Sequence, residues 1–442
     1  MFLIYNVLLA LSTAFLAPYY LVKVFFGGKY RKSIGPKLGI VPSGIFQDMK
    51  GEPRIWVHAV SVGEVNAAVP IIASLRESLP GACIVLSTAT ETGQEAARKM
   101  ALSATACIYY PLDIPVVIRK LLKRVDPDIF VIVETELWPN FIRICKEKGK
   151  KIVMVNGRMS PRSFRRYFAT RFFWQRVLAC IDGLGAISET DAKRFKAAGA
   201  SSDKIRVLGN SKYDALSMRV GPELKDETAG RLNIRRDAKV LVGGSTHEGE
   251  EKILFSVYRR VLASYPDLLL IIIPRHVERG RDILSCAAGE GFEDCIAMSD
   301  ILNGRKREGE RVVIVDVMGE LFKIYSIASV VFCGGSLVPR GGQNILEPAA
   351  WGKVVLYGPF MDDFMDEKAL LEQAGAGISV RNGEELQRKI IDLLGDPDAL
   401  SRKGEAGKKI IRENSGAALR YAEMILQTIM GKIPGSKFPN AE

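Results

Sequence analysis

The sequence has few histidines and no closely paired cysteines. Only three histidines occur among 442 residues, and the seven cysteines, at positions 83, 107, 145, 180, 286, 295 and 333, form no Cys-x-x-Cys pair. A multi-histidine metal site is therefore nearly excluded, and the scattered thiols indicate a reduced, cytosol-facing chain instead of a disulfide scaffold. Neither a Walker loop nor a Gly-x-Gly-x-x-Gly fingerprint is present, so the common phosphate-binding motifs are missing as well.

The composition is that of an ordinary globular protein with a positive balance. Hydrophobic residues make up 48% and charged residues 25% of the chain, which excludes a disordered or collagen-like protein. The length predicts two or three domains. Lys and Arg number 62 against 50 Asp and Glu, a net charge of +12. An anionic partner is therefore expected: nucleic acid, a membrane surface or a phosphorylated substrate.

Residues 1–22 carry no charge, and five basic residues follow between positions 23 and 37. Twenty-odd apolar residues in a helix match the hydrocarbon thickness of a bilayer, and Tyr19 and Tyr20 suit its headgroup boundary. A secretory signal peptide would need a basic start, which is missing. We expect an uncleaved membrane anchor over residues 1–26. Whether it spans the bilayer, or lies along it with a kink at Pro18, stays open.

Short apolar runs then alternate with helix-length amphipathic stretches. This alternation predicts α/β architecture, with parallel sheets covered by helices on both faces. A polar, charged stretch broken by Gly-Pro interrupts the pattern and is interpreted as a linker. We therefore expect two doubly wound, Rossmann-like domains facing a cleft: 27–219, linker 220–237 and 238–400, followed by a helical segment and tail at 401–442. The expected strands are 54–60, 83–88, 108–110, 129–133, 152–155, 183–187, 240–242, 268–273, 312–315, 330–333 and 354–357.

Four charged residues of the first half lie near the ends of predicted strands, where ligands bind in such sheets. Glu64 lies in HAVSVGE at the start of a helix, and fits a general base or a plain capping acid equally well. Glu134 and Glu136 follow a β-branched run. A carboxylate buried there without a partner would be costly, so at least one should meet a cation or a substrate hydroxyl. Lys212 could neutralise developing negative charge, although a solvated surface lysine is the commoner case.

The second half has residues that suit a nucleotide. Arg275 ends a very apolar strand and fits bidentate phosphate recognition. A glycine-rich loop runs from 334 to 342, and a helix expected near Gln343 would offer free N–H groups to an anion. Glu347, one turn into that helix, could hold vicinal ribose hydroxyls. The combination favours a nucleotide site over a bare turn.

Residues 158–176 contain six arginines, six aromatic residues and no acid. Arg162, Arg165 and Arg166 would face a membrane surface or a phosphorylated lipid, with aromatic rings in the interface. Two alternatives are a charged helix whose aromatic residues belong to the core, and a nucleic-acid surface. The apolar N-terminus favours the membrane.

Taken together, these motifs resemble the 3-deoxy-D-manno-octulosonic acid (Kdo) transferases of lipid A biosynthesis. The resemblance covers nearly the whole chain. Its carriers, in order, are HAVSVGE, ETELWPN, VNGRMS, GNSKYD, GGSTHEGEE, PRH, MGEL and GGQNILEP.

The resemblance implies an inverting glycosyltransferase of the GT-B fold that uses CMP-Kdo as donor and a lipid A precursor (lipid IVA) as acceptor. It implies Glu64 as general base, with Glu134 and Lys212 stabilising the transition state, and no cofactor or metal. The basic residues that follow position 22 predict that the rest of the chain lies on the cytoplasmic face of the inner membrane. No nucleic-acid partner is expected, because the basic charge is concentrated beside the apolar N-terminus and not over a recognised nucleic-acid motif. The implied CMP-binding residues are Pro274, Arg275, Met318, Gly319, Glu320, Asn344, Ile345, Leu346 and Glu347.

Two other functions fit the same residues less well. One is a GT-B transferase or a nucleotide-sugar epimerase that takes a nucleotide-diphosphate donor. The other is a membrane-tethered binding protein that has kept the fold, which the presence of Glu64 disfavours.

Overall fold

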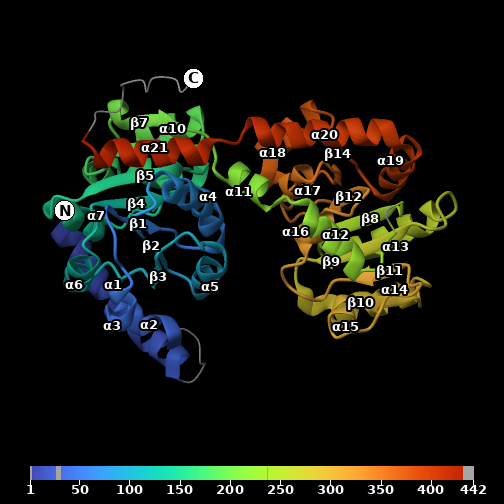
Figure 1. Cartoon of the computed structure of the whole chain (residues 1–442), viewed down its shortest axis with the longest axis horizontal. Coiled ribbons are helices and arrows are strands. Elements are labelled where there is room, and N and C mark those ends of the chain that lie inside the picture. Colours follow the sequence, from blue (N-terminus) through green and yellow to red (C-terminus); the bar gives the residue numbers. More distant parts are fainter. Residues whose placement is uncertain (1, 26–30, 236, 432–442) are drawn as a thin grey trace. The chain divides into compact units, whose positions relative to one another are not determined.

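The computed structural model describes residues 2–25, 31–235 and 237–431, with side chains for 2–15, 32–235 and 237–431. The chain forms two compact units (Figure 1). The first comprises Met1–Ala215 and Asn414–Glu442, and the second comprises Leu216–Glu413.

The first unit is built on a seven-stranded parallel sheet of order β3-β2-β1-β4-β5-β6-β7. Its central strands are almost entirely apolar because helices cover both faces. The strands are β1 (Arg54–His58), β2 (Cys83–Thr88), β3 (Ala106–Tyr109), β4 (Ile129–Val133), β5 (Lys151–Gly157), β6 (Gly183–Ala186) and β7 (Ile205–Val207). The helices are α1 (Phe2–Phe25), α2 (Arg31–Lys37), α3 (Ser43–Gln47), α4 (Val62–Ser78), α5 (Glu91–Met100), α6 (Pro115–Val125), α7 (Pro139–Glu147), α8 (Pro161–Ala169), α9 (Arg171–Leu178), α10 (Glu189–Ala197), α11 (Lys212–Arg219, which continues into the second unit) and α21 (Ala417–Ile429).

The second unit repeats this plan with a parallel sheet of order β10-β11-β9-β8-β12-β13-β14. Its strands are β8 (Val240–Thr246), β9 (Leu269–Pro274), β10 (Cys295–Ala297), β11 (Val312–Ile314), β12 (Val330–Cys333), β13 (Val354–Tyr357) and β14 (Gly377–Ser379). Its helices are α12 (Pro222–Arg231), α13 (Glu250–Val261), α14 (Gly280–Gly289), α15 (Met298–Leu302), α16 (Leu321–Tyr325), α17 (Leu346–Ala350), α18 (Met365–Gln373), α19 (Gly383–Gly395) and α20 (Pro397–Glu413). Two parallel-sheet α/β units are therefore confirmed.

The last helix, α21, completes the core of the first unit. In Figure 1 it runs across the first sheet beside β5, and it packs against α4 and β5. The Tyr421 side chain is fully buried, and its hydroxyl donates to the Gly209 carbonyl at 2.7 Å. Gly416 N–H donates to Asp214 Oδ1 at 2.6 Å. The chain therefore leaves the first unit after Ala215 and returns to it at Asn414.

Two expected segments, the linker at 220–237 and the N-terminal anchor, contain helices in the structure. Within 220–237, expected to be a linker, the structure has helix α12, which begins at Pro222 and packs against α16 in the second unit. The N-terminal segment is helical over Phe2–Phe25. Among the described residues, no helix is long and apolar enough to cross a membrane. The side chains of Pro18, Tyr19 and Tyr20 lie outside the described residues.

Candidate active site

Glu64 lies in the first turn of α4, directly after β1, and its side chain is buried. Its carboxylate accepts a hydrogen bond from Val60 N–H at 2.6 Å and one from the Ser61 hydroxyl at 3.3 Å. Both donors belong to the loop that joins β1 to α4. The loop therefore fixes the direction of the carboxylate, in the manner of a capping acid. The capping interpretation is confirmed, and the general base stays a prediction, because a capping geometry does not prevent one oxygen from meeting a ligand.

The electrostatics of Glu64 differ from those of an ordinary capping acid. Burial, with smaller contributions from the charges of Glu136 and Glu134, raises the pKa of its carboxyl from 4.5 to about 8, against the lowering effect of the Val60 hydrogen bond. Burial and the Glu134 charge also raise the pKa of Glu136. Three carboxyl groups thus share one region at the carboxyl ends of β1 and β4. A group with a pKa near the working pH is suited to general base catalysis.

Glu134 follows β4 immediately and pairs with Lys212. The Lys212 Nζ to Glu134 Oε1 distance is 2.6 Å, so the expectation that one of the two acids has a cationic partner is confirmed. The Glu134 backbone is left-handed, with φ at 61°. Such conformations cost about 1–3 kcal/mol and concentrate at functional sites. Lys212 is the first residue of α11, and its side chain is one-third exposed, so its ammonium group reaches both Glu134 and solvent.

Asn156, a residue without a predicted role, holds the Lys212 segment in place. Asn156 lies near the end of β5, is buried, and has a left-handed φ of 52°. Its Oδ1 accepts from the Ser211 N–H at 2.9 Å, and the Ser211 hydroxyl donates to the Ala67 carbonyl at 2.8 Å. These bonds tie the residue before Lys212 to β5 and α4. The Asn-Gly pair at the end of a β-branched run was the signal that could have found it.

In the second unit, Glu250 connects the loop after β8 to the loop after β12 through hydrogen bonds. Its buried carboxylate accepts from the backbone N–H groups of His247, Gly335, Ser336 and Leu337 at 2.7–3.0 Å. A carboxylate that receives several N–H groups is strongly stabilised. Glu250 therefore holds the glycine loop after β12 against the loop after β8. Gly334 is required at this junction, because a Cβ there would collide with the Ser245 backbone.

The expected donor-binding residues share the carboxyl edge of the second sheet. Arg275 directly follows Pro274, the last residue of β9, and both it and His276 are exposed. The His276 and His247 rings are 6.1 Å apart. Arg279, by contrast, already has a partner, because its guanidinium donates two hydrogen bonds, at 2.8 and 3.2 Å, to the buried Glu251 carboxylate. Arg275 is therefore the arginine of this loop that is presented to a ligand.

Residues 318–320 form the turn after β11. Met318 is 84% exposed, and Gly319 takes a left-handed φ of 90° that favours glycine. The Glu320 side chain faces Arg231 at 3.2 Å and Lys323 at 2.9 Å. The Glu320 carboxylate is thus engaged within the unit, which leaves the backbone of the turn as the part that can meet a ligand.

The helix expected to start near Gln343 begins three residues later, and the first of its N–H groups is already bonded. Helix α17 begins at Leu346, has five residues, and its Leu346 N–H already donates to Asn344 Oδ1 at 3.0 Å. Ile345 is fully buried beside it. The Glu347 carboxyl has a pKa raised by burial, against the lowering effects of Arg219 and Asn344. Arg219 lies 4.0 Å from it.

The basic stretch 158–176 forms two helices, α8 and α9, which meet at Thr170. Arg162, Arg165 and Arg166 are exposed, so these arginines face solvent. The aromatic residues divide into two sets. Phe164, Tyr167, Phe173 and Trp174 pack against the core of the first unit, whereas Phe168 and Phe172 are exposed.

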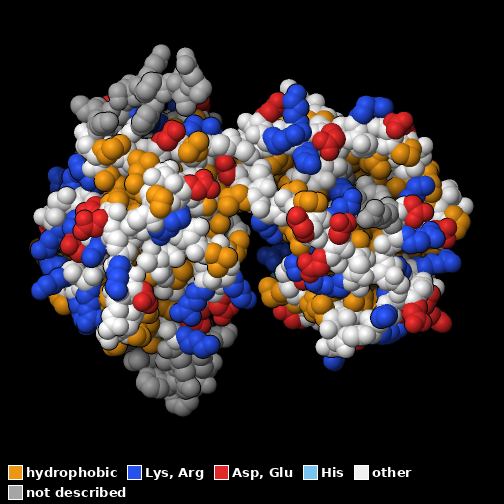
Figure 2. All heavy atoms as spheres, in the orientation of Figure 1, with side chains coloured by type: hydrophobic (Ala, Val, Ile, Leu, Met, Phe, Trp, Pro, Cys, Tyr) orange, Lys and Arg blue, Asp and Glu red, His pale blue; other side chains and the backbone are white. Residues whose placement is uncertain are grey.

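Helix α1 packs beside α9 on the same unit. The Phe2 and Tyr5 rings each lie 5.9 Å from the Phe173 ring. The Tyr5 hydroxyl donates to Asp113 at 2.9 Å, and the Asn140 amide donates to Asn6 at 2.6 Å. The other face of α1 carries exposed apolar side chains: Leu3, Ile4, Val7, Leu8, Leu11 and Phe15. In Figure 2, Lys and Arg side chains gather beside α6 and α7, and α7 contacts α9.

Comparison with known proteins places these features in context. Residues 32–215 match the family model described as 3-deoxy-D-manno-octulosonic-acid transferase (kdotransferase). The chain is 31% identical over 399 residues to the 3-deoxy-D-manno-octulosonic acid transferase of Haemophilus influenzae, which covers 90% of this chain and 91% of that protein. It is 29% identical over 436 residues to the transferase of the same name from Chlamydia trachomatis serovar A, with 96% and 97% coverage.

Solved structures resemble the chain in fold. A crystal structure of UDP-N-acetylglucosamine 2-epimerase aligns with a TM-score of 0.60 at 15% identity, and covers 89% of this chain and 100% of that one. A glycosyltransferase from Rickettsia africae aligns with a TM-score of 0.54 at 15% identity, over 86% of this chain and 99% of that one. At these identities the similarity concerns the GT-B-like fold alone.

Proposed function

This chain belongs to the 3-deoxy-D-manno-octulosonic acid (Kdo) transferase family, and we propose that it transfers Kdo from CMP-Kdo to a sugar hydroxyl of a lipid A precursor. The observation that carries the proposal is Glu64, whose buried carboxyl has a pKa of about 8 and lies close to Glu134 and Glu136. A carboxyl with such a pKa is suited to take a proton from an alcohol, a step that a transferase requires and a binding protein does not.

The proposed reaction is a single displacement with inversion. Glu64 takes the proton of the acceptor hydroxyl as that oxygen bonds to the anomeric carbon of Kdo. The bond from this carbon to the phosphate oxygen breaks, and CMP departs with the electron pair. Lys212, paired with Glu134 at 2.6 Å, supplies positive charge near the reacting groups. No step requires a metal. Within the described residues, no group of three or more His, Cys, Asp or Glu is arranged to hold one.

The CMP moiety is assigned to the carboxyl edge of the second sheet. The exposed Arg275 guanidinium suits the phosphate, and the left-handed turn at Gly319 offers backbone groups to the nucleotide. Asn344 and Glu347 complete the proposed site through their side chains. Leu346 contributes little directly, because its N–H is already bonded to Asn344.

Mass spectrometry of a tetra-acylated lipid A precursor incubated with CMP-Kdo tests the proposal. We expect the lipid mass to increase by one or more Kdo units, with inhibition by CMP and none by UDP. Arg275→Ala should weaken inhibition by CMP about tenfold or more, because a charge-assisted phosphate contact is lost. Arg281→Ala, an exposed arginine on α14, is the matched control. Inhibition by UDP in place of CMP would favour a nucleotide-diphosphate donor.

The acceptor is a lipid, and we propose that α1 and α8–α9 attach the enzyme to the cytoplasmic face of the inner membrane. Two contiguous features support this placement. The exposed face of α1 is apolar, and the neighbouring helices expose Arg162, Arg165 and Arg166. Apolar side chains that enter the interface beside arginines on lipid phosphates are typical of helices that lie on a membrane.

Charged substitutions on α1 should therefore release the enzyme from anionic vesicles. Leu8 and Leu11 are 58% and 63% exposed. We expect Leu8→Glu/Leu11→Glu to lower the fraction that sediments with phosphatidylglycerol vesicles at least tenfold, because each leucine contributes about 1.5–3 kcal/mol when buried. Leu102→Glu provides the control, since Leu102 is 84% exposed in the loop after α5. Equal sedimentation of both variants would contradict the proposed attachment.

A further inference from the structure

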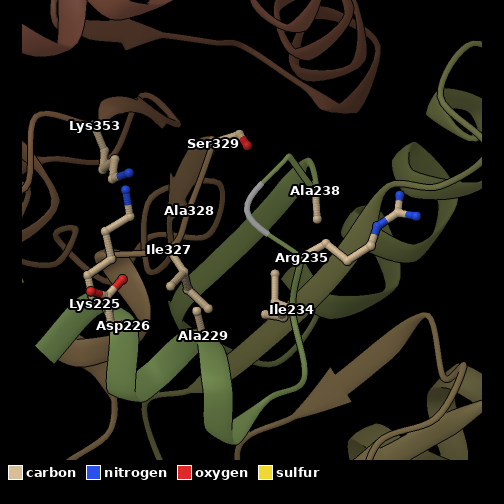
Figure 3. Close-up of a pocket in the computed structure, with 10 residues that line it drawn as sticks. All are labelled: Lys225, Asp226, Ala229, Ile234, Arg235, Ala238, Ile327, Ala328, Ser329 and Lys353. Atoms are coloured by element: carbon tan, nitrogen blue, oxygen red, sulfur yellow. The ribbon is translucent and has the colours of Figure 1, made fainter. Parts of the chain in front are cut away.

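A cavity lies in the second unit, away from the residues assigned to CMP. It has a volume of about 530 Å³ (Figure 3). Its lining comes from α12 and from the residues that precede β8, β12 and β13, including Ala238, Ser329 and Lys353. In a parallel sheet these strand starts share one edge, opposite the carboxyl edge that carries Arg275. No residue of the cavity lining belongs to the proposed donor site.

Two lysines from different elements converge in this cavity. Figure 3 shows the ammonium groups of Lys225, on α12, and Lys353, just before β13, pointing toward each other. Lys353 is half-buried, and its pKa is lowered to about 8 by burial and by the charges of Lys225 and Lys408. Among the described side chains that line the cavity, Asp226 is the single acid, and it is exposed. Lysines brought together in this way repel one another, at a cost that a bound anion would remove.

The other walls indicate the size and character of the ligand. Ala229, Ile234 and Ile327 give one side an apolar surface. The Ser329 hydroxyl accepts from Val240 N–H at 3.1 Å, and its own O–H remains a donor. A cavity of this volume falls within the range of small-molecule sites, which combine apolar walls with a few placed polar groups.

We propose that this cavity binds a phosphoryl group carried by a second ligand, held between the ammonium groups of Lys225 and Lys353. The remainder of that ligand would lie on the apolar wall formed by Ala229 and Ile327. A phosphoryl dianion offsets the repulsion between the two lysines by accepting hydrogen bonds from both ammonium groups. The site is independent of the donor site, so the second ligand can bind with CMP-Kdo present.

Lysine acetylation measured by peptide mass spectrometry tests this site. With limiting acetic anhydride at pH 7.5, we expect 10 mM inorganic phosphate to slow acetylation of Lys353 at least fivefold, relative to chloride of equal ionic strength. Lys225→Met should reduce this protection to less than twofold. Lys306→Met, an exposed lysine of the same unit, should leave it unchanged. Protection should also persist in Arg275→Ala, which separates the cavity from the donor site.

Two further arms identify the source of the phosphoryl group. Protection by soluble phosphate or pyrophosphate indicates a soluble ligand, whereas protection by phosphatidylglycerol vesicles alone indicates a lipid headgroup. Either result supports a phosphoryl site at these lysines. The same rate of Lys353 acetylation with phosphate, pyrophosphate, vesicles and chloride, or protection that survives Lys225→Met, would overturn it.

Discussion

Glu64→Gln is expected to lower the rate of Kdo transfer by about 10²–10⁴-fold while the fold is retained, because an amide cannot accept the proton of the acceptor hydroxyl. The substitution keeps the size of the side chain and an oxygen that can accept from Val60 N–H. The product lipid, measured by mass spectrometry, gives the rate. Turnover within tenfold of wild type would remove Glu64 as the base.

The pH dependence of transfer should follow the Glu64 carboxyl. Its pKa is raised to about 8, so the carboxylate required for catalysis is the minor form at neutral pH. We expect kcat/KM to rise about tenfold per pH unit up to about pH 8, and then to level. Glu136→Gln is the informative companion, because the Glu136 charge contributes to the raised pKa of Glu64. This variant should keep turnover and move the rising limb to lower pH. An unmoved limb would mean that another group titrates.

Stability gives an independent measure of the same pKa. The ordinary value for Glu64 is 4.5, so between about pH 4.5 and 8 the unfolded chain releases a proton that the folded chain retains. Wild type should therefore lose stability relative to Glu64→Gln as the pH rises through this window. The difference in Tm between the two proteins, followed from pH 5 to 9, measures the effect without any substrate.

Glu250→Ala should destabilise the second unit by about 3–5 kcal/mol, because four backbone N–H groups would lose the buried carboxylate that they share. Hydrogen exchange of the Gly335, Ser336 and Leu337 amides should accelerate strongly, since each donates to Glu250. Urea unfolding and exchange mass spectrometry measure the two effects.

Glu248→Ala is the matched control for this prediction. Glu248 is an exposed acid two residues earlier in the same motif. Its loss should change stability by no more than about 0.5 kcal/mol. Unchanged exchange at the glycine loop in Glu250→Ala would show that the loop is held by its own packing.

The strands that could be predicted are those buried in the sheet interiors. Residues 83–88, 129–133, 330–333 and 354–357 are strands with the expected bounds, because continuous apolar runs flanked by polar residues have few other solutions. The strands for which the sequence predicted no residue range are β7, β10 and β14. Each has three residues and lies at an edge of its sheet. An edge strand that short has too few buried positions to give a pattern.

The candidate site could be predicted only in part, because several of its contacts join residues that lie far apart in the sequence. That Glu134 or Glu136 needed a cation followed from the cost of burying a carboxylate, but the choice of Lys212 depends on contacts across 78 positions of chain. Glu250 appeared as one acid in a Glu-rich helix start. Its hydrogen bonds to a loop some 85 residues away produce no pattern in the neighbouring sequence that could have predicted them.

The return of α21 to the first unit has a consequence for synthesis on the ribosome. The second unit is continuous in sequence, so it can fold as soon as residue 413 has emerged. Synthesis of the first unit begins earlier, but its core is completed later. Its buried core includes Tyr421, Ala422 and Ile425, which are synthesised near the end of the chain. Until then the nascent chain exposes the apolar surface that α21 will cover. We therefore expect chaperones that hold unfinished chains to associate chiefly with this unit, although it is made first.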